Sequence, residues 1–316
     1  MKISVDPQKA DSIFLYFYFR LPSIVSYVEN HALQSGVPHI NLGILKQFDI
    51  HLPPLPIQRK IAAILSAYDD LIENNNRRIS ILEKMAEELY REWFVRLRFP
   101  GHGKVKIVKG VPEGWTVKRI GDLVVATMGQ SPSSEFYNQN GIGLPFNQGV
   151  GTYGSRFPKK EVYCDTKGRI AEQGDILISV RAPVGRLNIA DCKMIIGRGL
   201  ASLRHKNGLN SYLYYLLKQI FSSEDIIGNG AIFNSVTKDE LLGSKLLAPS
   251  DSLDELFNNN IKPIDGLIAS LINKTELLTN SRDRLLTRLM SGKIDVAELD
   301  IQFPPGMKET EGVPDA

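Results

Sequence analysis

Residues 57–98 read IQRKIAAILSAYDDLIENNNRRISILEKMAEELYREWFVRLR, and nothing in them interrupts a helix over about forty residues. The stretch follows the proline-rich segment 53–56 and stops before Pro100 and Gly101, so residues that bound helices stand at both ends. A heptad count from Ile61 places apolar residues at positions a, d and e, which predicts a seam for a partner helix. The expected seam comprises Ile61, Ile64, Leu65, Tyr68, Leu71, Ile72, Asn75, Ile79, Leu82, Met85, Ala86, Leu89 and Trp93.

The partner appears in an internal repeat, because a shift of 196 residues lays this seam on a second one. The matched positions are Ile61 with Phe257, Leu65 with Ile261, Asp69 with Asp265, Leu71 with Leu267, Ile72 with Ile268, Leu82 with Leu278, and Leu89 with Leu285. The second helix is expected to start at a capping box, Ser252 to Glu255, and to end at Gly292. We therefore predict two long helices, 57–100 and 252–292, paired as an antiparallel coiled coil.

Composition indicates an ordinary globular chain, since 43% of its 316 residues are hydrophobic and 23% are charged. Residues 13–21 form the one strong apolar run near the start, and this run is too short to span a bilayer. A cytoplasmic protein without membrane association is therefore expected. Two cysteines and five scattered histidines make no zinc-ligand set, so Cys164 and Cys192 are interpreted as small buried hydrophobes, and no metal site is expected.

Charge is distributed unevenly although the net charge is only +3. Residues 101–250 carry a net charge of +7, and residues 251–316 carry −5. The basic excess is densest over residues 156–206, which hold 11 basic and 5 acidic side chains. Such a local excess attracts a polyanion, although a solvated basic face is an equally good interpretation.

The first repeat unit is shorter than the second. A complete unit, 101–296, has 196 residues, whereas the first has 100, so about 96 residues are expected to be missing at its front. Residues 1–56 are interpreted as the C-terminal remnant of a domain, with an aromatic helix over 10–30 and a strand at 48–52. A natural truncation and a split reading frame both explain this. The last segment, 293–316, is expected to be a loose acidic tail.

Residues 101–251 are predicted to form the complete counterpart, a mixed α/β domain, so the fold class is α+β with two long helices. Strand patterns cover 114–127, 174–180 and 197–203, and an amphipathic helix covers 210–221. A polar, glycine-rich stretch lies between the first two of these strands.

This arrangement resembles the DNA-specificity subunit of type I restriction-modification systems. The resemblance covers nearly the whole chain and rests on short pieces in a fixed order: Leu-Pro-Pro-Leu-x-x-Gln at 52–58 before a long helix, Val-Pro-Glu-Gly-Trp at 111–115, Ile-Gly-Asp at 120–122, Gly-Asp-Ile-Leu-Ile-Ser at 174–179, Arg-Ala-Pro-Val-Gly at 181–185, and Gly199.

The resemblance implies two target-recognition domains held apart by the helices, each reading one part of a split double-stranded DNA site. It also implies methyltransferase (M) and restriction (R) subunits as partners. No cofactor is expected in this chain, because S-adenosylmethionine, ATP and magnesium would be used by the partner subunits. The chain departs from the family in lacking most of the first recognition domain.

An enzyme is not indicated by the residues. The Asn/Asp-Pro-Pro-Tyr/Phe motif of adenine methyltransferases and the phosphate loop GxxxxGK[ST] are both absent from the sequence. Asp165, Glu172 and Asp175 lie near Lys167, but turn and solubility roles explain these acids better than a nuclease site does. No catalytic residue is therefore predicted.

DNA recognition needs basic residues for phosphates and polar side chains for base edges. Arg181, which follows a buried strand pattern, is the best single candidate, while plain turn composition explains many of the others equally well. The predicted DNA-binding residues are Gln130, Ser131, Ser134, Tyr137, Gln148, Tyr153, Arg156, Lys159, Lys160, Arg181, Arg186, Arg198 and Arg204.

Two other functions compete with DNA reading. A truncated regulatory copy would use its helices to bind methyltransferase or full-length specificity subunits without directing methylation; an autonomous nuclease is the third and weakest alternative. A homodimer would supply the recognition domain twice and read an interrupted palindrome. Phe14, Phe17 and Phe19 oppose the dimer, because they are expected to be exposed without the rest of their domain.

Overall fold

The computed structural model describes residues 4–31, 50–222, 235–304 and 307. The chain separates into two compact units, of which the first comprises residues 1–81 and 268–316 and the second comprises residues 82–267. Within the described ranges, no helix combines the length and the apolar content that crossing a membrane requires.

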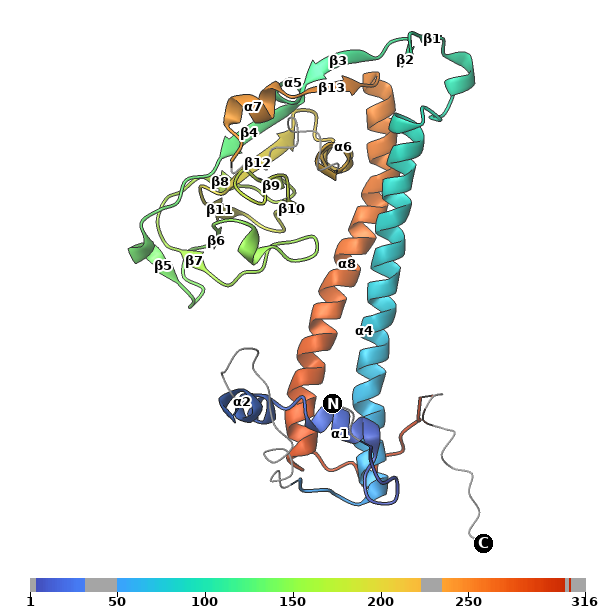
Figure 1. Ribbon diagram of the computed structural model, residues 1–316, viewed down its shortest axis with the longest axis vertical. Helices are drawn as coiled ribbons and strands as arrows, with labels where there is room; N and C mark the ends of the chain where they lie inside the picture. Colours follow the sequence, from blue (N-terminus) through green and yellow to red (C-terminus); the bar gives the residue numbers. More distant parts are fainter. Residues whose placement is uncertain (1–3, 32–49, 223–234, 305–306, 308–316) are drawn as a thin grey trace. The chain divides into compact units, whose positions relative to one another are not determined.

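Two long helices form as predicted. Helix α4 spans Leu55–Tyr90 and helix α8 spans Asp251–Met290 (Figure 1). Helix α4 continues into a π-helical turn, η1 (Arg91–Val95), before the chain reaches Pro100. At the other end of the repeat, Gly292 has a φ of +68°, the left-handed conformation that commonly ends a helix, which confirms the predicted cap.

The buried stripe of α4 differs in phase from the predicted seam. Ile61 and Leu65, at positions a and e, are 3% and 0% exposed, whereas Leu71 and Met85, at position d, are 51% and 55% exposed. The assignment of Leu71 and Met85 to the seam was therefore wrong. Positions a and e alternate in steps of four and three residues, which is the spacing of a coiled-coil seam. These two positions therefore form the seam without position d. Leu267, which lies 196 residues after Leu71 and is its counterpart in the repeat, is likewise 41% exposed, so the repeat also places a leucine on the outer face of each helix.

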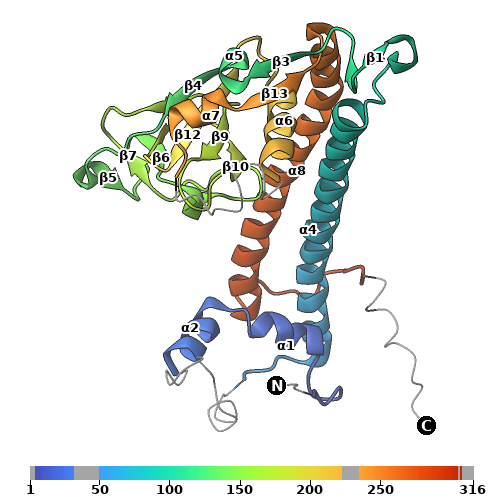
Figure 2. The same ribbon diagram turned by 45° about the horizontal axis from the view of Figure 1, so that its top comes forward.

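The helices pair antiparallel, as predicted. In the first unit, Ile61 near the start of α4 shares a hydrophobic cluster with Leu289 near the end of α8. In the second unit, the rings of Tyr90 at the end of α4 and of Trp93 in the following turn η1 each lie 5.6 Å from the ring of Phe257, near the start of α8. Figures 1 and 2 both show the two helices side by side.

The N-terminal segment is packed on the helices of the first unit. It forms α1 (Ser12–Tyr18) and α2 (Pro22–His31), and the Asp11 carboxylate caps α1 by accepting from two backbone amides. Phe14 and Phe17 are each only 2% exposed and share the cluster that contains the start of α4. The expectation that these two rings would be exposed was wrong, because the long helices supply the apolar surface that covers them.

The described part of the predicted loose tail is also packed. Val296 is 1% exposed in the same cluster, and the Lys60 ammonium donates to the carbonyl oxygens of Ala297 and Leu299 at 2.6 and 2.9 Å. Residues 293–301 are therefore part of the first unit rather than a loose tail. The strand predicted at 48–52 lies partly outside the described residues, and residues 50–52 have no regular structure.

The second unit contains the predicted mixed α/β domain. Its main sheets have the strand orders β5-β7-β6-β11-β8 and β10-β9-β12-β4, and β13-β3 and β1-β2 form two-stranded sheets. The strands are β1 (Ile107–Val108), β2 (Val111–Pro112), β3 (Thr116–Arg119), β4 (Val124–Met128), β5 (Tyr137–Asn138), β6 (Leu144–Asn147), β7 (Tyr163–Cys164), β8 (Ile170–Ala171), β9 (Ile176–Ser179), β10 (Leu187–Ile189), β11 (Met194–Ile196), β12 (Leu200–His205) and β13 (Lys245–Ala248). The helices between them are η2 (His102–Lys104), α5 (Ile120–Leu123), η3 (Ser134–Phe136), η4 (Val150–Thr152), α6 (Asn210–Ser222) and α7 (Lys238–Gly243).

Strands β9 and β12 form the centre of the four-stranded sheet and confirm two predicted strands. All four residues of β9 are buried, as a continuous apolar run favours, and β12 pairs antiparallel with both β9 and β4. Helix α6 contacts β9, β10 and β12 and confirms the predicted helix. The alternation at 114–127 was only partly correct, because the helical turn α5 separates β3 from β4.

Candidate nucleic-acid interface

The segments after β4 and before β12 meet through their backbones. The amide of Gly129 donates to the carbonyl of Leu200 at 2.9 Å, and the amide of Gln130 donates to the carbonyl of Ile196 at 3.0 Å. A Cβ atom on Gly129 would lie 2.1 Å from the carbonyl oxygen of Gly197, so only glycine allows this approach. The exposed Gln130 side chain is therefore held at a fixed place on the domain.

A third segment, which follows β6, joins the same place. The amide of Gly199 donates to the carbonyl of Gln148 at 3.2 Å, and the Ser131 hydroxyl donates to the side-chain oxygen of Gln148 at 3.2 Å. The Ser131 hydroxyl in turn accepts from the amide of Arg198 at 3.2 Å. The side chains of Gln148 and Arg198 are both exposed, so two glutamines and one arginine from three loops lie together.

Arg181 adjoins this group through the end of β9. The amide of Val180 donates to the carbonyl of Gly199 at 2.9 Å, and the next side chain, Arg181, is exposed. Arg186 lies on the other arm of the same hairpin, because its carbonyl accepts from the amide of Ser179 at 2.9 Å, and it too is exposed. Residues 129–131, 148–149, 180–181 and 197–199 are called the four-loop junction here.

The two lysines predicted to bind phosphates are on the segment before β7. Lys159 is exposed and lies 3.8 Å from the carboxylate of Glu161, while the Lys160 ammonium lies 2.6 Å from that of Asp191. The Asp191 partner raises the pKa of Lys160, so this lysine keeps its charge. Both lysines remain accessible to solvent, and exposed pairs of this kind exchange readily for phosphate contacts.

Four further predicted residues stand outside the junction or use their polar group within the domain. The Tyr137 hydroxyl donates to the carbonyl of Pro132 at 2.8 Å, and the Tyr153 hydroxyl oxygen is buried. Arg204 donates through Nε to the buried Asp175 carboxylate at 2.6 Å and is 46% exposed. Ser134 is exposed on η3.

Arg156 does not lie on the surface. It is 1% exposed and its guanidinium lies 2.5 Å from the carboxylate of Asp265 and 3.7 Å from that of Glu83. The prediction of Arg156 as a DNA contact is corrected accordingly, because a buried arginine committed to two carboxylates cannot reach a groove. Basic composition alone could not show this, since Asp265 is 109 residues away in the chain.

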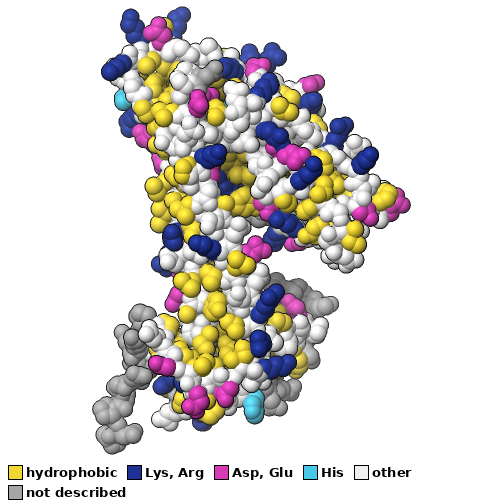
Figure 3. Space-filling model, turned by 180° about the vertical axis from the view of Figure 1, so that it is seen from behind, with side chains coloured by type: hydrophobic (Ala, Val, Ile, Leu, Met, Phe, Trp, Pro, Cys, Tyr) yellow, Lys and Arg dark blue, Asp and Glu magenta, His cyan; other side chains and the backbone are white. Residues whose placement is uncertain are grey.

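Arg169 lies next to the segment that leads into the junction, although it was not among the predicted DNA-binding residues. Its side chain is exposed, and its carbonyl accepts from the amide of Ile196 at 2.9 Å, next to the segment that carries Arg198. The available signal was its position within the basic run 156–206. Figure 3 shows acidic side chains interspersed with basic ones on the face that it presents, so basic residues there do not form one unbroken field.

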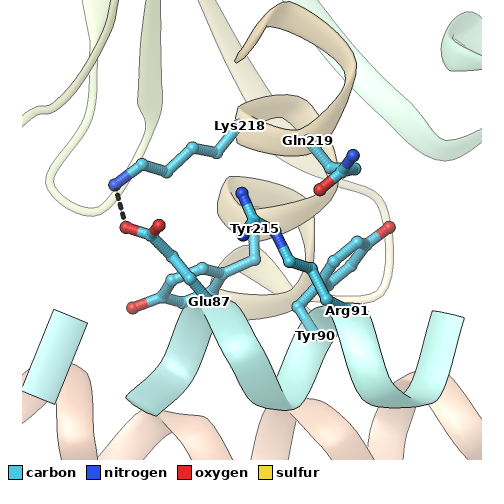
Figure 4. Close-up of a pocket in the computed structure, with 6 residues that line it drawn as sticks. All are labelled: Glu87, Tyr90, Arg91, Tyr215, Lys218 and Gln219. Atoms are coloured by element: carbon cyan, nitrogen blue, oxygen red, sulfur yellow. Dashed lines mark hydrogen bonds and ion pairs between the residues drawn. The ribbon is translucent and has the colours of Figure 1, made fainter. Parts of the chain in front are cut away.

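A catalytic centre is not supported by the described part of the chain. No group of three or more His, Cys, Asp or Glu side chains that could hold a metal occurs among the residues searched. A shallow hollow between α4 and α6 is lined by Glu87, Tyr90, Arg91, Tyr215, Lys218 and Gln219 (Figure 4). Its Lys218 ammonium and Glu87 carboxylate lie 2.5 Å apart, so their charges are already paired.

The comparisons with known proteins agree with this reading of the fold. The family model described as "Type I restriction modification DNA specificity domain" matches residues 1–84 and 112–274. A Methanocaldococcus jannaschii protein, provisionally described as the MjaX specificity subunit of a type I restriction enzyme, is 34% identical over 289 residues, which cover 90% of this chain and 68% of that protein. The MjaIX specificity subunit of the same organism is 27% identical over 304 residues, covering 91% of this chain and 70% of that protein.

A solved structure supports the fold. The crystal structure of a type I restriction-modification S subunit from M. genitalium matches with a TM-score of 0.58 at 20% identity, over 90% of this chain and 74% of that one. The likeness at this identity concerns the arrangement of an α/β domain and paired long helices. The family match over most of the chain and the relative that is 34% identical show that this protein belongs to the type I restriction-modification DNA specificity family and is a non-catalytic DNA specificity subunit.

Proposed function

We propose that the α/β domain of the second unit reads DNA through the four-loop junction. The observation that carries the proposal is the meeting of Gln130, Gln148 and Arg198, three exposed side chains held together by hydrogen bonds between their loops. Arg181 extends this group along the end of β9. Glutamine makes paired hydrogen bonds with adenine and arginine does so with guanine in the major groove, so the set has the chemistry of direct base reading.

The residues around the junction are assigned to the DNA backbone. Arg186, Lys159 and Lys160 are exposed and basic, and Arg169 adds a further charge beside the junction. Contacts to phosphates orient a protein on the duplex without reading its sequence. Arg156 has no part in this surface, and Ser134, Tyr137, Tyr153 and Arg204 are secondary candidates.

We infer that methyltransferase and restriction subunits are the protein partners. Relatives of this chain are named as subunits of type I restriction enzymes, and exposed hydrophobic side chains on both long helices offer a surface for them. These side chains are Leu71, Ile81, Met85, Leu256, Leu267 and Leu277, and hydrophobic areas of this kind are visible in Figure 3. S-adenosylmethionine, ATP and magnesium would then act in the partner subunits, and the complex would work in the cytoplasm, where its DNA lies.

A homodimer is the assembly that would read a two-part site with one kind of domain. Two copies related by a two-fold axis would present the same junction in opposite orientations, and the target would be an interrupted palindrome. The burial of Phe14 and Phe17 weakens the objection that exposed aromatic rings would misdirect such assembly, and Phe19 is partly buried.

The test is a mobility-shift assay on the full chain, with and without the methyltransferase subunit. Arg181→Ala should lower affinity for the preferred sequence by roughly tenfold or more. Lys159→Ala should instead weaken binding to all duplexes alike and reduce the slope of log affinity against log salt concentration by about one. Specific binding that is unchanged in both variants would refute the site.

Methylation mapping with the methyltransferase subunit decides between the functions. A defined methylated motif supports DNA reading, and a palindromic motif supports the homodimer. Complex formation with the methyltransferase subunit but without specific DNA binding or methylation would instead favour the regulatory function.

A further inference from the structure

Arg156 is a buried cation that joins the α/β domain to both long helices of its unit. It lies in the segment between β6 and β7 and is the largest fully buried side chain among the described residues. Its ion pairs reach Asp265 on α8 at 2.5 Å and Glu83 on α4 at 3.7 Å. One side chain therefore connects three separate segments of the second unit.

Two tyrosines of α6 complete the site. The guanidinium lies over the Tyr214 ring at 4.6 Å and 6.0 Å from the Tyr215 ring, and the Tyr215 hydroxyl donates to the same Asp265 oxygen at 2.9 Å. Burial by itself opposes the charged form, but the Asp265 carboxylate more than offsets this and raises the pKa of Arg156, which therefore remains a cation. A buried charge of this kind is stable only while its partners stay in place.

The same segment begins in the four-loop junction. It comprises residues 148–158 and is fixed at Thr152 to the residues on either side of it. The Thr152 hydroxyl donates to the side-chain oxygen of Asn147 at 2.6 Å, and the carbonyl of Thr152 accepts from the amide of Lys159 at 2.7 Å. At its far end, the carbonyl of Arg156 accepts from the amide of Ile189 at 2.9 Å. The segment is thus held at the junction and at Arg156.

The internal repeat marks the acceptor position independently. Asp265 lies 196 residues after Asp69. In the first unit, Asp69 accepts from Arg282 at 2.5 Å and from Arg20 at 3.3 Å. The same position on each long helix therefore receives arginine, and in each unit at least one of these arginines comes from a segment packed on the helix.

We propose that Arg156 is a positioning residue for DNA recognition, because its contacts with Asp265, Glu83 and Tyr214 hold the 148–158 segment, and with it Gln148, against the helix pair. Arg156 acts without touching DNA. The link to recognition rests on the proposed function, whereas the anchoring of the segment can be tested without DNA.

The first measurement is amide hydrogen exchange of the full chain. In Arg156→Ala, the amides of residues 149–157 should exchange about tenfold faster or more, while those of β9 and α6 keep their protection. Arg156→Lys keeps the charge but loses the planar contact with the ring, so it should restore part of the protection. Lys159→Ala is the matched control, because it removes an exposed cation three residues after Arg156 and should leave the segment unchanged.

The second measurement is binding to a duplex pool with a randomised core, enriched on the wild-type chain. Arg156→Ala should lower affinity about tenfold without changing the slope of log affinity against log salt, because no phosphate contact is lost. Lys159→Ala should lower that slope. If Arg156→Ala fails to fold, Asp265→Asn removes the partner charge at nearly constant shape and should give the same two results.

Three outcomes would overturn the inference. Unchanged exchange at 149–157 would show that Arg156 does not hold the segment, and equally faster exchange throughout the second unit would show a general stabilising role only. A lower salt slope in Arg156→Ala would indicate direct phosphate contact. A wild-type chain that binds no duplex defeats the proposed function and the link to recognition, while the exchange result still decides whether Arg156 anchors the segment.

Discussion

Replacing Phe257 by alanine tests whether the aromatic cluster around this residue stabilises the second unit. The Phe257 side chain is 0% exposed, and its ring lies 5.2 Å from that of Phe94 and 5.6 Å from those of Tyr90 and Trp93. Removing a fully buried phenylalanine costs about 3–5 kcal/mol, because both the transfer free energy and the contacts around the cavity are lost. We expect a decrease in the free energy of unfolding within that range.

Tryptophan fluorescence in urea is the appropriate assay. The chain has two tryptophans, and both Trp93 and Trp115 lie in the cluster that contains Phe257, so the signal reports this unit. With a denaturant slope of about 2 kcal/mol per molar, the midpoint should fall by about 1.5–2.5 M. Leu256→Ala is the control, since Leu256 is 44% exposed and its loss should change stability by less than about 0.5 kcal/mol. Equal midpoints for the two variants would show that the cluster does not determine the stability of the unit.

Two other predictions concern the junction and alkaline pH. Gly129→Ala should destabilise the domain and abolish specific DNA binding, because its Cβ would lie 2.1 Å from the Gly197 carbonyl oxygen, whereas Gly151→Ala meets nothing within 4 Å and should behave as wild type in the same melting and mobility-shift assays. Burial raises the pKa of Tyr90, Tyr212 and Tyr215 above the ordinary value near 10. The stability that their neutral forms provide is complete below pH about 10 and is lost as pH rises beyond it. Phenolate absorbance should therefore appear for these groups together with unfolding, and their titration in the folded chain near pH 10 would contradict the burial.

The long helices were predictable because their pattern extends over many turns and occurs twice. A heptad count identified the apolar residues, and the 196-residue shift supplied the partner helix. The phase of the stripe was less secure, since apolar residues occupied a, d and e alike. Only the packing shows that Leu71 and Met85 face outward.

The residues of the proposed DNA interface were predictable as residue types but not as a set. Arg156 and Arg198 both lie in the same basic run of the sequence. The structure separates them, because Arg156 meets an acid from a distant helix while Arg198 stays exposed beside Gln148. Long-range ion pairs of this kind depend on the tertiary fold, which local composition does not contain. The convergence of the loops likewise depends on strand order, in which β6 and β11 pair in parallel although 46 residues lie between Asn147, the last residue of β6, and Met194, the first of β11.

The repeat nevertheless contained information about Arg156 that charge counting ignored. Asp69 and Asp265 occupy the same position on the two helices, beside the buried stripe, where an acid without a cation would be unfavourable. Each acid therefore required a basic partner, and the structure supplies Arg282 and Arg20 to one and Arg156 to the other. The aspartate is repeated on both helices, whereas the arginines that pair with it come from different parts of the chain, because different segments pack on the helices in the two units. In a repeated scaffold, acids that recur beside an apolar stripe thus mark positions where basic residues are used in packing, and the arginines paired there are not available to bind DNA.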